Sequence, residues 1–290
     1  MQVHDILPDE LDYVSAVCLD PSIPAKWREA MAPCMNCRKE WLREMMKRGL
    51  RISVALAKPE TAIKSLTSKN VKFKSMTVRG NFPQGLVEYV PIEHTVEPVK
   101  GEDSLFINCM WVVPPFWNKG VATALVQTVI EKAKAYGSAS VLAYEGDKWF
   151  GYFPYMPADF FRKFGFKEVD RDGTRVLLKL GKGKSPRIVR LKTKPTREVE
   201  QTAVTIFYNS QCPWSGWMMN RAKQKLATYD VQLNIINTDD RKTTEKYGMS
   251  RGIMVNGIPK IKRMVSWKEV ESLLVQLKIP KKRDAKNPKA

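Results

Sequence analysis

One stretch near the middle of the chain constrains its fold more than any other. An apolar run over Leu105–Val113 predicts a buried strand, and a loop follows over Pro114–Lys119. Apolar residues spaced three and four apart then predict a helix over Gly120–Tyr136, and Ser140–Tyr144 predicts the next strand. Because a strand–helix–strand unit favours parallel pairing of its two strands, the sequence predicts an α/β domain built on a sheet.

Further elements are predicted on both sides of this unit. Before it, hydrophobic periodicity indicates one helix, Pro24–Gly49, and three strands, Arg51–Ala57, Val71–Val78 and Gln84–Val90. After it, we expect a short helix over Pro157–Phe164 and a hairpin formed by Phe166–Val169 and Arg175–Leu180.

The helix that begins at Gly120 has the properties of an anion site. A helix start presents unpaired backbone N–H groups and the positive end of the helix dipole, which suits a pyrophosphate. Gly120 and Ala122 keep this backbone approachable, because a bulky side chain would block the anion. Many strand–helix joins share these features, so on physical grounds alone a phosphate site and an ordinary turn both stay open.

The same segment resembles the acyl-CoA motif of the GNAT superfamily, Gln/Arg-x-x-Gly-x-Gly/Ala. Gly120 and Ala122 match its last two fixed positions, while Trp117 stands at the first. Tyr155–Phe166 is similar to the second GNAT motif, a short helix that ends in Gly-Phe. The resemblance implies a mixed, mostly antiparallel sheet with helices on both faces. It also implies an acyltransferase that uses acetyl-CoA or a related acyl-CoA and an amine-bearing acceptor.

The resemblance also implies which residues bind the cofactor. Trp111–Val113 are expected to pair with the pantetheine arm through main-chain atoms, and the loop and first helical turn are expected to hold the pyrophosphate. The cofactor-binding residues predicted in this way are Trp111, Val112, Val113, Trp117, Asn118, Lys119, Gly120, Val121, Ala122, Thr123 and Phe161.

Acyl transfer to an amine needs a base for the amine, a polarised carbonyl and an acid for the leaving thiolate. Many GNAT members use as acid a Tyr four residues before the Gly of the second motif, a position held here by Phe161. We therefore predict Tyr155 as the acid, with Tyr152 as an alternative, and Glu88 as the base. The alternatives to Glu88 are Glu93, Glu145 and His94.

A second α/β unit begins at Ala203. The segment Thr205–Ser215 resembles the start of a thioredoxin fold, with Cys212 before a helix, and the order of the two units resembles proteins that end in a YoaP-like domain. A helix start lowers the pKa of a thiol, so Cys212 is expected to be the most reactive cysteine. Ser215 replaces the second cysteine, and the cis-proline expected near Met249–Ser250 is missing. This unit is therefore predicted either to position substrate or to use Cys212 as a single thiol.

The cysteines give no disulfide framework. Five occur at irregular spacing, which fits a reducing compartment. Cys34-Met-Asn-Cys37 and Cys18 lack the fourth ligand of a typical zinc site, so no metal is predicted. Cys109, within an apolar strand, is expected to behave as a small buried hydrophobe. No apolar run approaches about 18 residues and the start lacks signal-peptide features, so we expect a cytoplasmic protein without a membrane span.

Charge is unevenly distributed along the chain. Residues 186–290 hold 22 Lys and Arg against 9 acidic residues, a net charge of +13 out of +19 for the whole chain. Basic–aromatic interleaving is missing, so at most non-specific nucleic-acid binding is expected. We predict a GNAT domain over 1–181, a basic linker over 182–200, a thioredoxin-like domain over 201–279 and a basic tail over 280–290. Two other functions stay open, a catalytically degenerate binding protein and a monothiol redox or electrophile-handling protein.

Overall fold

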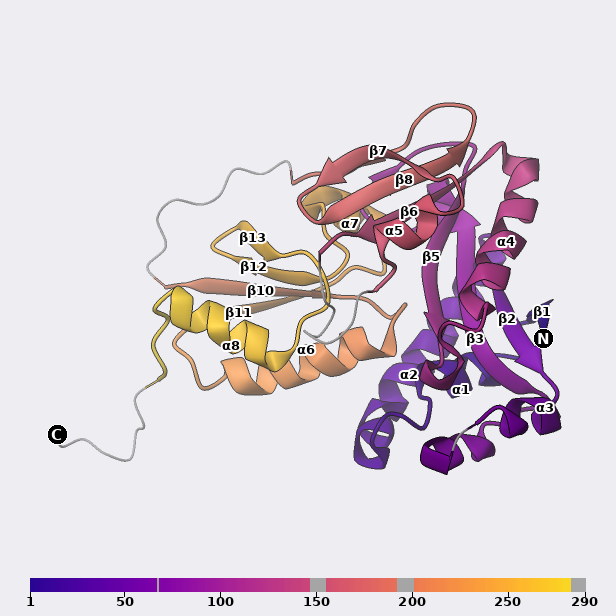
Figure 1. Ribbon diagram of the computed structural model, residues 1–290. Helices are drawn as coiled ribbons and strands as arrows, with labels where there is room; N and C mark the ends of the chain where they lie inside the picture. The colour runs from indigo at the N-terminus through magenta and orange to yellow at the C-terminus, as the bar shows by residue number, and fades with distance from the viewer. Residues whose placement is uncertain (67, 147–154, 192–200, 283–290) are drawn as a thin grey trace.

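The computed structural model describes residues 1–66, 68–146, 155–191 and 201–282. Two α/β domains lie side by side, each with its own sheet and hydrophobic core (Figure 1). The strands of the larger sheet lie between Gln2 and Gly181, and those of the smaller sheet lie between Ala203 and Ile261. Within the described ranges, no helix is both long and apolar enough to cross a lipid bilayer.

The N-terminal sheet has seven strands in the order β1-β2-β3-β5-β6-β8-β7. Only β5 and β6 pair in parallel, so the sheet is mixed and mostly antiparallel, as the sequence predicts. The strands are β1 (Gln2–Asp5), β2 (Arg51–Ala57), β3 (Phe82–Pro91), β5 (Leu105–Val112), β6 (Ser138–Tyr144), β7 (Lys167–Asp172) and β8 (Arg175–Gly181).

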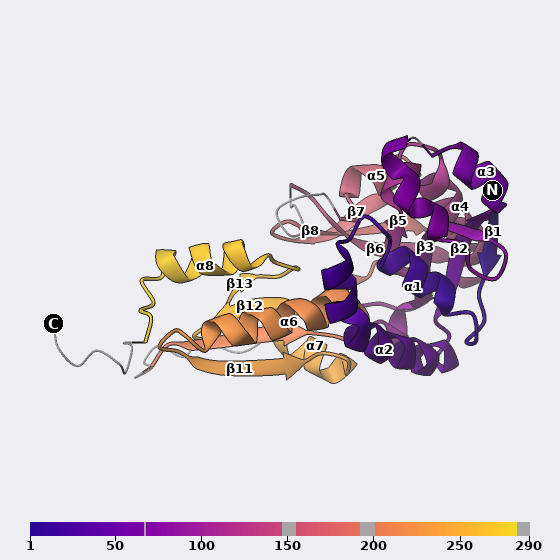
Figure 2. The ribbon, with the colours of Figure 1, turned by 90° about the horizontal axis from the view of Figure 1, so that it is seen from below.

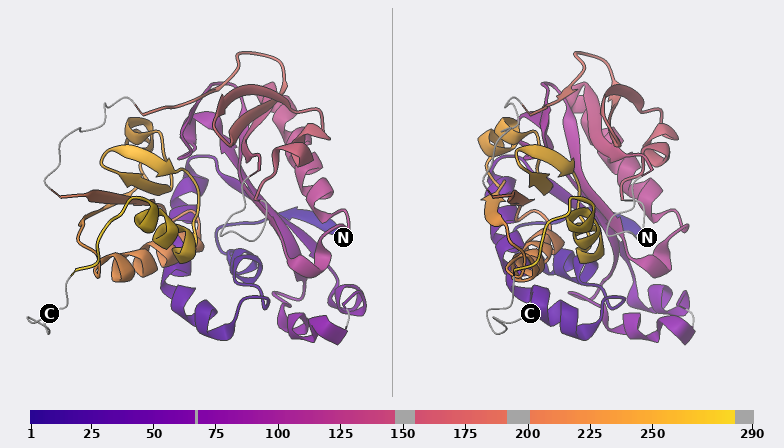
Figure 3. Two further views of the ribbon diagram at one scale, coloured as in Figure 1. Left: turned by 60° about the vertical axis from the view of Figure 1, so that its left-hand side comes forward. Right: turned by 90° about the vertical axis from the view of Figure 1, so that its left-hand side faces the viewer.

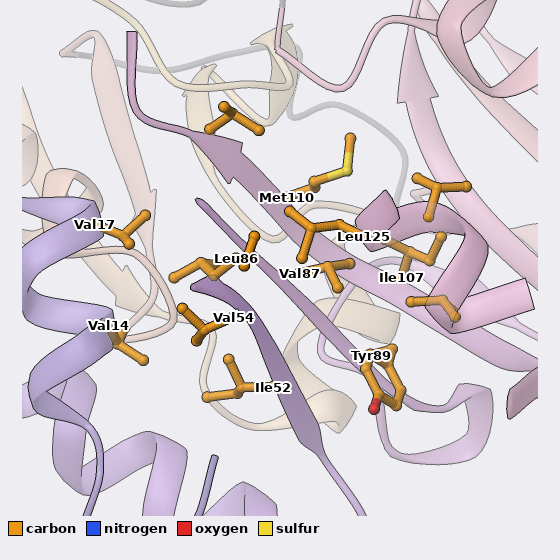
Figure 4. Close-up of a cluster of buried hydrophobic side chains, with 14 of the residues drawn as sticks. Val14, Val17, Ile52, Val54, Leu86, Val87, Tyr89, Ile107, Met110 and Leu125 are labelled. Carbon is orange, nitrogen blue, oxygen red and sulfur yellow. The ribbon is translucent and has the colours of Figure 1, made fainter. Parts of the chain in front are cut away.

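Helices cover both faces of this sheet. From one side, α1 (Asp12–Cys18) packs on β3 and β5, and α2 (Ala25–Lys47) lies beside it (Figure 2). From the other side, α4 (Val121–Ala133) packs on β2, β3 and β5. Figure 4 shows the result: Val14 and Val17 approach one face of the strands, and Leu125 approaches the other. Because β3 side chains alternate between these faces, Glu88 points toward α1 and α2.

Strands β5 and β6 separate halfway along their length. They pair only at Leu105–Ile107 and Ala139–Val141, after which β5 continues with β3 alone. The register between β3 and β5 shifts beside Glu88, so Asn108 is an extra residue in β5, a β-bulge. A bulge bends its strand, and the strands diverge at this point. The opening lies directly before the loop that leads into α4.

The C-terminal domain has a four-stranded sheet in the order β11-β10-β12-β13. Its strands are β10 (Ala203–Tyr208), β11 (Gln232–Asn237), β12 (Gly252–Val255) and β13 (Ile258–Ile261), and its helices are α6 (Pro213–Leu226), α7 (Arg241–Tyr247) and α8 (Trp267–Gln276). Asn256 and Gly257 both have positive φ, at 48° and 75°, as the two-residue turn of the β12–β13 hairpin requires. Ser266 and Glu269 form a capping box at the start of α8.

The prediction of a strand over Val71–Val78 is wrong. The segment lies mostly in a 3-10 helix, η1 (Ser68–Ser75), while β2 and β3 pair directly with each other. Phe73 and Met76 are its buried side chains, and their spacing of three residues fits a tight helical turn rather than the alternation of a strand.

Several short elements had no sequence prediction or lie in predicted loops. They are α3 (Pro59–Lys64), η2 (Ile92–His94) and η3 (Pro114–Phe116). The short helix predicted over Pro157–Phe164 is present as α5 (Ala158–Arg162), and the end of the helix predicted over Gly120–Tyr136 is the 3-10 turn η4 (Lys134–Tyr136). Within the predicted linker, β9 (Arg187–Ile188) pairs with β4 (Val99–Lys100), and Ile188 is buried. Residues 192–200 of that linker and 283–290 of the predicted tail lie outside the described residues.

Candidate active site

The start of α4 is an open, exposed turn. Gly120 is its N-cap residue with φ of 77°, and Asn118 is also left-handed with φ of 60°. No side chain caps the helix, and a Cβ placed on Gly120 would meet no atom within 4 Å. The first backbone N–H groups of α4 therefore face open space, which is the geometry of an anion site.

Trp117 takes the place of the usual Gln or Arg and packs back on the strand. Its indole Nε1 donates to the carbonyl oxygen of Val112 at 2.6 Å, and its ring meets Trp111 edge to face at 6.0 Å. Val113 donates its N–H to Gln84 at the edge of β3. Because main-chain groups alternate sides in an antiparallel ladder, those of Val112 point away from β3 toward the opening between β5 and β6.

Glu88 is completely buried and paired with Arg38. Their side chains form an ion pair, with Arg38 supplied by the middle of α2. Burial raises the pKa of the Glu88 carboxyl, and the Arg38 charge partly opposes that rise. The Gln211 side chain of the C-terminal domain also acts on this carboxyl as a hydrogen-bond donor and lowers its pKa. No local sequence pattern points to Arg38, because a single Arg in a charged stretch of helix normally faces solvent.

The three predicted catalytic residues converge beside the β5 bulge. Glu88 pairs in register with Cys109, and the Tyr155 hydroxyl donates to Cys109 Sγ at 3.1 Å. Cys212 is half-buried as the N-cap residue of α6 and packs against Tyr144 and Tyr155. Burial raises the pKa of Tyr155 well above its ordinary value, so its hydroxyl keeps its proton.

The other residues predicted from the sequence lie away from this cluster or outside the described residues. Glu145 forms ion pairs with Arg162 and Arg171 at the surface, and Glu93 and His94 are exposed in η2. Phe161 is fully buried among other Phe rings, so the prediction that it lines the cofactor site is not supported by its position. Tyr152 lies outside the described residues.

The described residues contain no candidate metal site. No cluster of three or more His, Cys, Asp or Glu side chains in residues 1–66, 68–146, 155–191 and 201–282 has the geometry to hold an ion. Cys34 instead lies against the first turns of α6, where its Sγ is 3.1 Å from a Cβ placed on Gly216. Cys34 therefore belongs to the packing between the domains.

The structure predicts a different order of cysteine reactivity from the one that the sequence predicts. Cys37 is exposed, whereas Cys212 is half-buried. Burial raises the pKa of Cys18 to about 12 and that of Cys109 well above its ordinary value. With limiting iodoacetamide at pH 7.5, read by peptide mass spectrometry, Cys37 should label first, and Cys18 and Cys109 last. Faster labelling of Cys212 than of Cys37 would mean that α6 is less covered in solution.

Comparison with known proteins agrees with this geometry. Residues 72–149 match the sequence model described as the Acetyltransferase (GNAT) family. The "Uncharacterized N-acetyltransferase YoaP" of Bacillus subtilis (strain 168) is 27% identical over 165 residues, which are 55% of this chain and 64% of that protein. The match thus spans less than two thirds of the relative. The chain carries a GNAT acetyltransferase domain.

Solved structures of similar shape include two N-acetyltransferases. The PaiA N-acetyltransferase from Thermoplasma acidophilum, solved in complex with coenzyme A, is 12% identical, with a TM-score of 0.37 over 63% of this chain and 100% of its own. An N-acetyltransferase from Staphylococcus aureus Mu50 is 13% identical, with a TM-score of 0.37 over 62% of this chain and 97% of its own.

Proposed function

We propose that this chain is an N-acyltransferase that transfers an acyl group from acetyl-CoA, or a related acyl-CoA, to an amine of a small molecule or peptide. The observation that carries the proposal is the separation of β5 from β6 directly before the open start of α4. One end of this opening offers unpaired helix N–H groups for a pyrophosphate. The other end reaches the buried carboxylate of Glu88.

The main chain supplies most of the proposed acyl-CoA contacts. The N–H groups of Gly120, Val121, Ala122 and Thr123 would bind the pyrophosphate, with Lys119 and Asn118 beside them. Along β5, the main chain of Trp111–Val113 would pair with the pantetheine arm. Since the Trp117 indole bonds to the Val112 carbonyl in the structure, Trp117 is proposed to turn aside when that arm binds.

The proposed chemistry uses Glu88 and Tyr155. The acyl-CoA supplies an acyl thioester, whose carbonyl carbon the amine nitrogen attacks, and the C–S bond breaks as the new C–N bond forms. Glu88 accepts the proton that the nitrogen loses, a role that suits a carboxylate whose pKa is raised by burial. Tyr155, which is protonated at rest, donates its proton to the departing thiolate. Glu88 then releases its proton to solvent and Tyr155 takes one up from solvent, which restores both groups.

The C-terminal domain is proposed to be thioredoxin-like and to position the acceptor. Its order of elements, strand–helix–strand–helix, then hairpin and helix, supports this assignment. Ser215 holds the turn before α6, because its hydroxyl accepts the N–H of Asn209 at 3.1 Å. A single Cys212 with Ser215 in this role favours positioning over dithiol chemistry. The cytoplasmic location and the at most non-specific binding of nucleic acid stay predictions.

A direct assay tests the proposed function. The purified full chain would be incubated with acetyl-CoA and, separately, an alkyl amine, a diamine, an amino acid, an amino sugar and a lysine peptide. Release of free CoA thiol and the acetylated amine would be measured together. We expect saturable acetyl-CoA binding by calorimetry and turnover of at least one amine. Protein that shows no acetyl-CoA binding would exclude the proposed function.

A further inference from the structure

Specific contacts fix the C-terminal domain against the N-terminal domain. Arg241 of α7 donates to three main-chain carbonyls of the N-terminal domain at 2.7 to 3.2 Å, those of Ile92, Thr95 and Val99. Helices α2 and α6 lie side by side (Figure 3), and Trp27 meets Trp217 at 5.3 Å between ring centres. The start of α6 is thereby held over the β5 bulge.

Gln211, just before Cys212, lies at the centre of this contact and is buried. Its Nε2 donates to the Asn108 carbonyl of the β5 bulge at 3.2 Å. Its Oε1 accepts from Arg251 Nη2 at 3.0 Å, and the same Arg251 atom donates to Glu97 at 2.8 Å. Both ends of the Gln211 amide are therefore fixed, one by each domain. Arg251 follows the position where the thioredoxin-like resemblance predicts a cis-proline.

The Gln211 side chain also lies next to the Glu88 carboxylate and lowers the pKa of that carboxyl. A Gln amide has two N–H groups, and only one is used by the Asn108 carbonyl. A buried carboxylate without a donor costs about 1–3 kcal/mol, and the second N–H of Gln211 is the neighbouring donor that offsets this cost.

We propose that the C-terminal domain completes the catalytic base, with Gln211 as a positioning residue that orients the Glu88 carboxylate across the domain contact. Glu88 lies on β3 and Gln211 just before α6, and both side chains are buried. The same Gln211 amide is fixed on the Asn108 carbonyl of the β5 bulge, beside Glu88. This inference rests on the proposed function and adds to it a residue of the second domain.

The test compares Gln211→Met, which keeps the side-chain length without the amide, with Arg241→Met as an interface control. The Glu88 carboxyl is followed by carbon-13 NMR in protein labelled at glutamate, and its signal is assigned by its loss in Glu88→Gln. In Gln211→Met we expect the Glu88 pKa to rise and kcat/KM for the best amine to fall about 10- to 100-fold. Acetyl-CoA affinity should stay within about twofold, and Arg241→Met should leave the Glu88 titration unchanged.

A second variant guards against a folding failure. Gln211→Glu keeps the shape and the contact to Arg251, and its added negative charge should raise the Glu88 pKa further. An unchanged Glu88 titration in both Gln211 variants, or an equal shift in Arg241→Met, would overturn the proposal. Because the titration needs no acceptor and acetyl-CoA binding is measured separately, failure of this positioning role is distinguishable from failure of the acyltransferase function.

Discussion

The Gly120→Glu variant should lose acetyl-CoA affinity by at least about 100-fold while it stays folded. At an effective dielectric constant of about 20, two like charges about 5 Å apart repel by roughly 3 kcal/mol, and a pyrophosphate brings more than one charge. The new side chain has room, since no atom lies within 4 Å of a Cβ at this position. Isothermal calorimetry with acetyl-CoA gives the affinity, and thermal unfolding monitors the fold.

Gly137 provides a matched control for this variant. It lies after η4, in the segment that follows α4, has φ of 80° against 77° for Gly120, and also has open space around it. Gly137→Glu therefore adds the same charge and a similar backbone strain far from the helix start. We expect its acetyl-CoA affinity to stay within about twofold of the parent. Wild-type affinity in a folded Gly120→Glu protein would place the anion site elsewhere.

Glu88→Gln should lower kcat by at least about 100-fold with little change in acetyl-CoA affinity, because general base catalysis contributes 10²–10⁴-fold. Activity of the parent should rise with pH as Glu88 loses its proton. Burial raises the Glu88 pKa above its ordinary value of 4.5, so this rise should occur at higher pH than for an exposed carboxyl. In Glu88→Gln the rise should disappear from the profile of kcat/KM against pH.

Two further variants make this result interpretable. Glu145→Gln changes the other predicted base, which the structure places in a surface ion-pair network with Arg162 and Arg171, and should keep parental kcat. Glu88→Gln leaves the Arg38 charge buried without its partner, at a cost of about 3–5 kcal/mol. The double variant Arg38→Met, Glu88→Gln removes that charge and should be more stable yet equally inactive. If the rise of kcat/KM with pH persists in either inactive variant, the base is a group other than Glu88.

Local patterns explain why much of the fold is predictable from the sequence. The strand and helix on either side of the Gly120 loop each show their own periodicity, and their parallel connection follows from the short chain between them. The Asn256–Gly257 turn is equally local, because Asn and Gly tolerate the positive φ that a two-residue hairpin needs. For Val71–Val78 the alternation is misleading, because Lys72 and Lys74 are exposed on a 3-10 helix while β2 pairs directly with β3.

The candidate site depends on contacts that no local pattern contains. Glu88 is predictable as a carboxylate on a strand beside the cleft, but its burial depends on Arg38 from a distant helix and on Gln211 from the other domain. Gln211 is a polar residue in a turn, a setting that normally indicates solvent exposure. Its function becomes visible only when the second sheet is placed against the first.

The distribution of charge gives the contact between the domains an unusual dependence on salt. Residues 1–185 carry a net charge of +6 and residues 186–290 one of +13, so the two halves repel each other over long range. Three ion pairs attract across the interface: Arg251 with Glu97 is buried and weakly screened, whereas Lys262 with Asp172 and Lys100 with Glu245 are partly exposed. The long-range repulsion falls off within a Debye length of about 8 Å at physiological salt. Raising the ionic strength therefore weakens this repulsion together with the two exposed pairs, so the contact depends less on salt than one formed by exposed ion pairs alone.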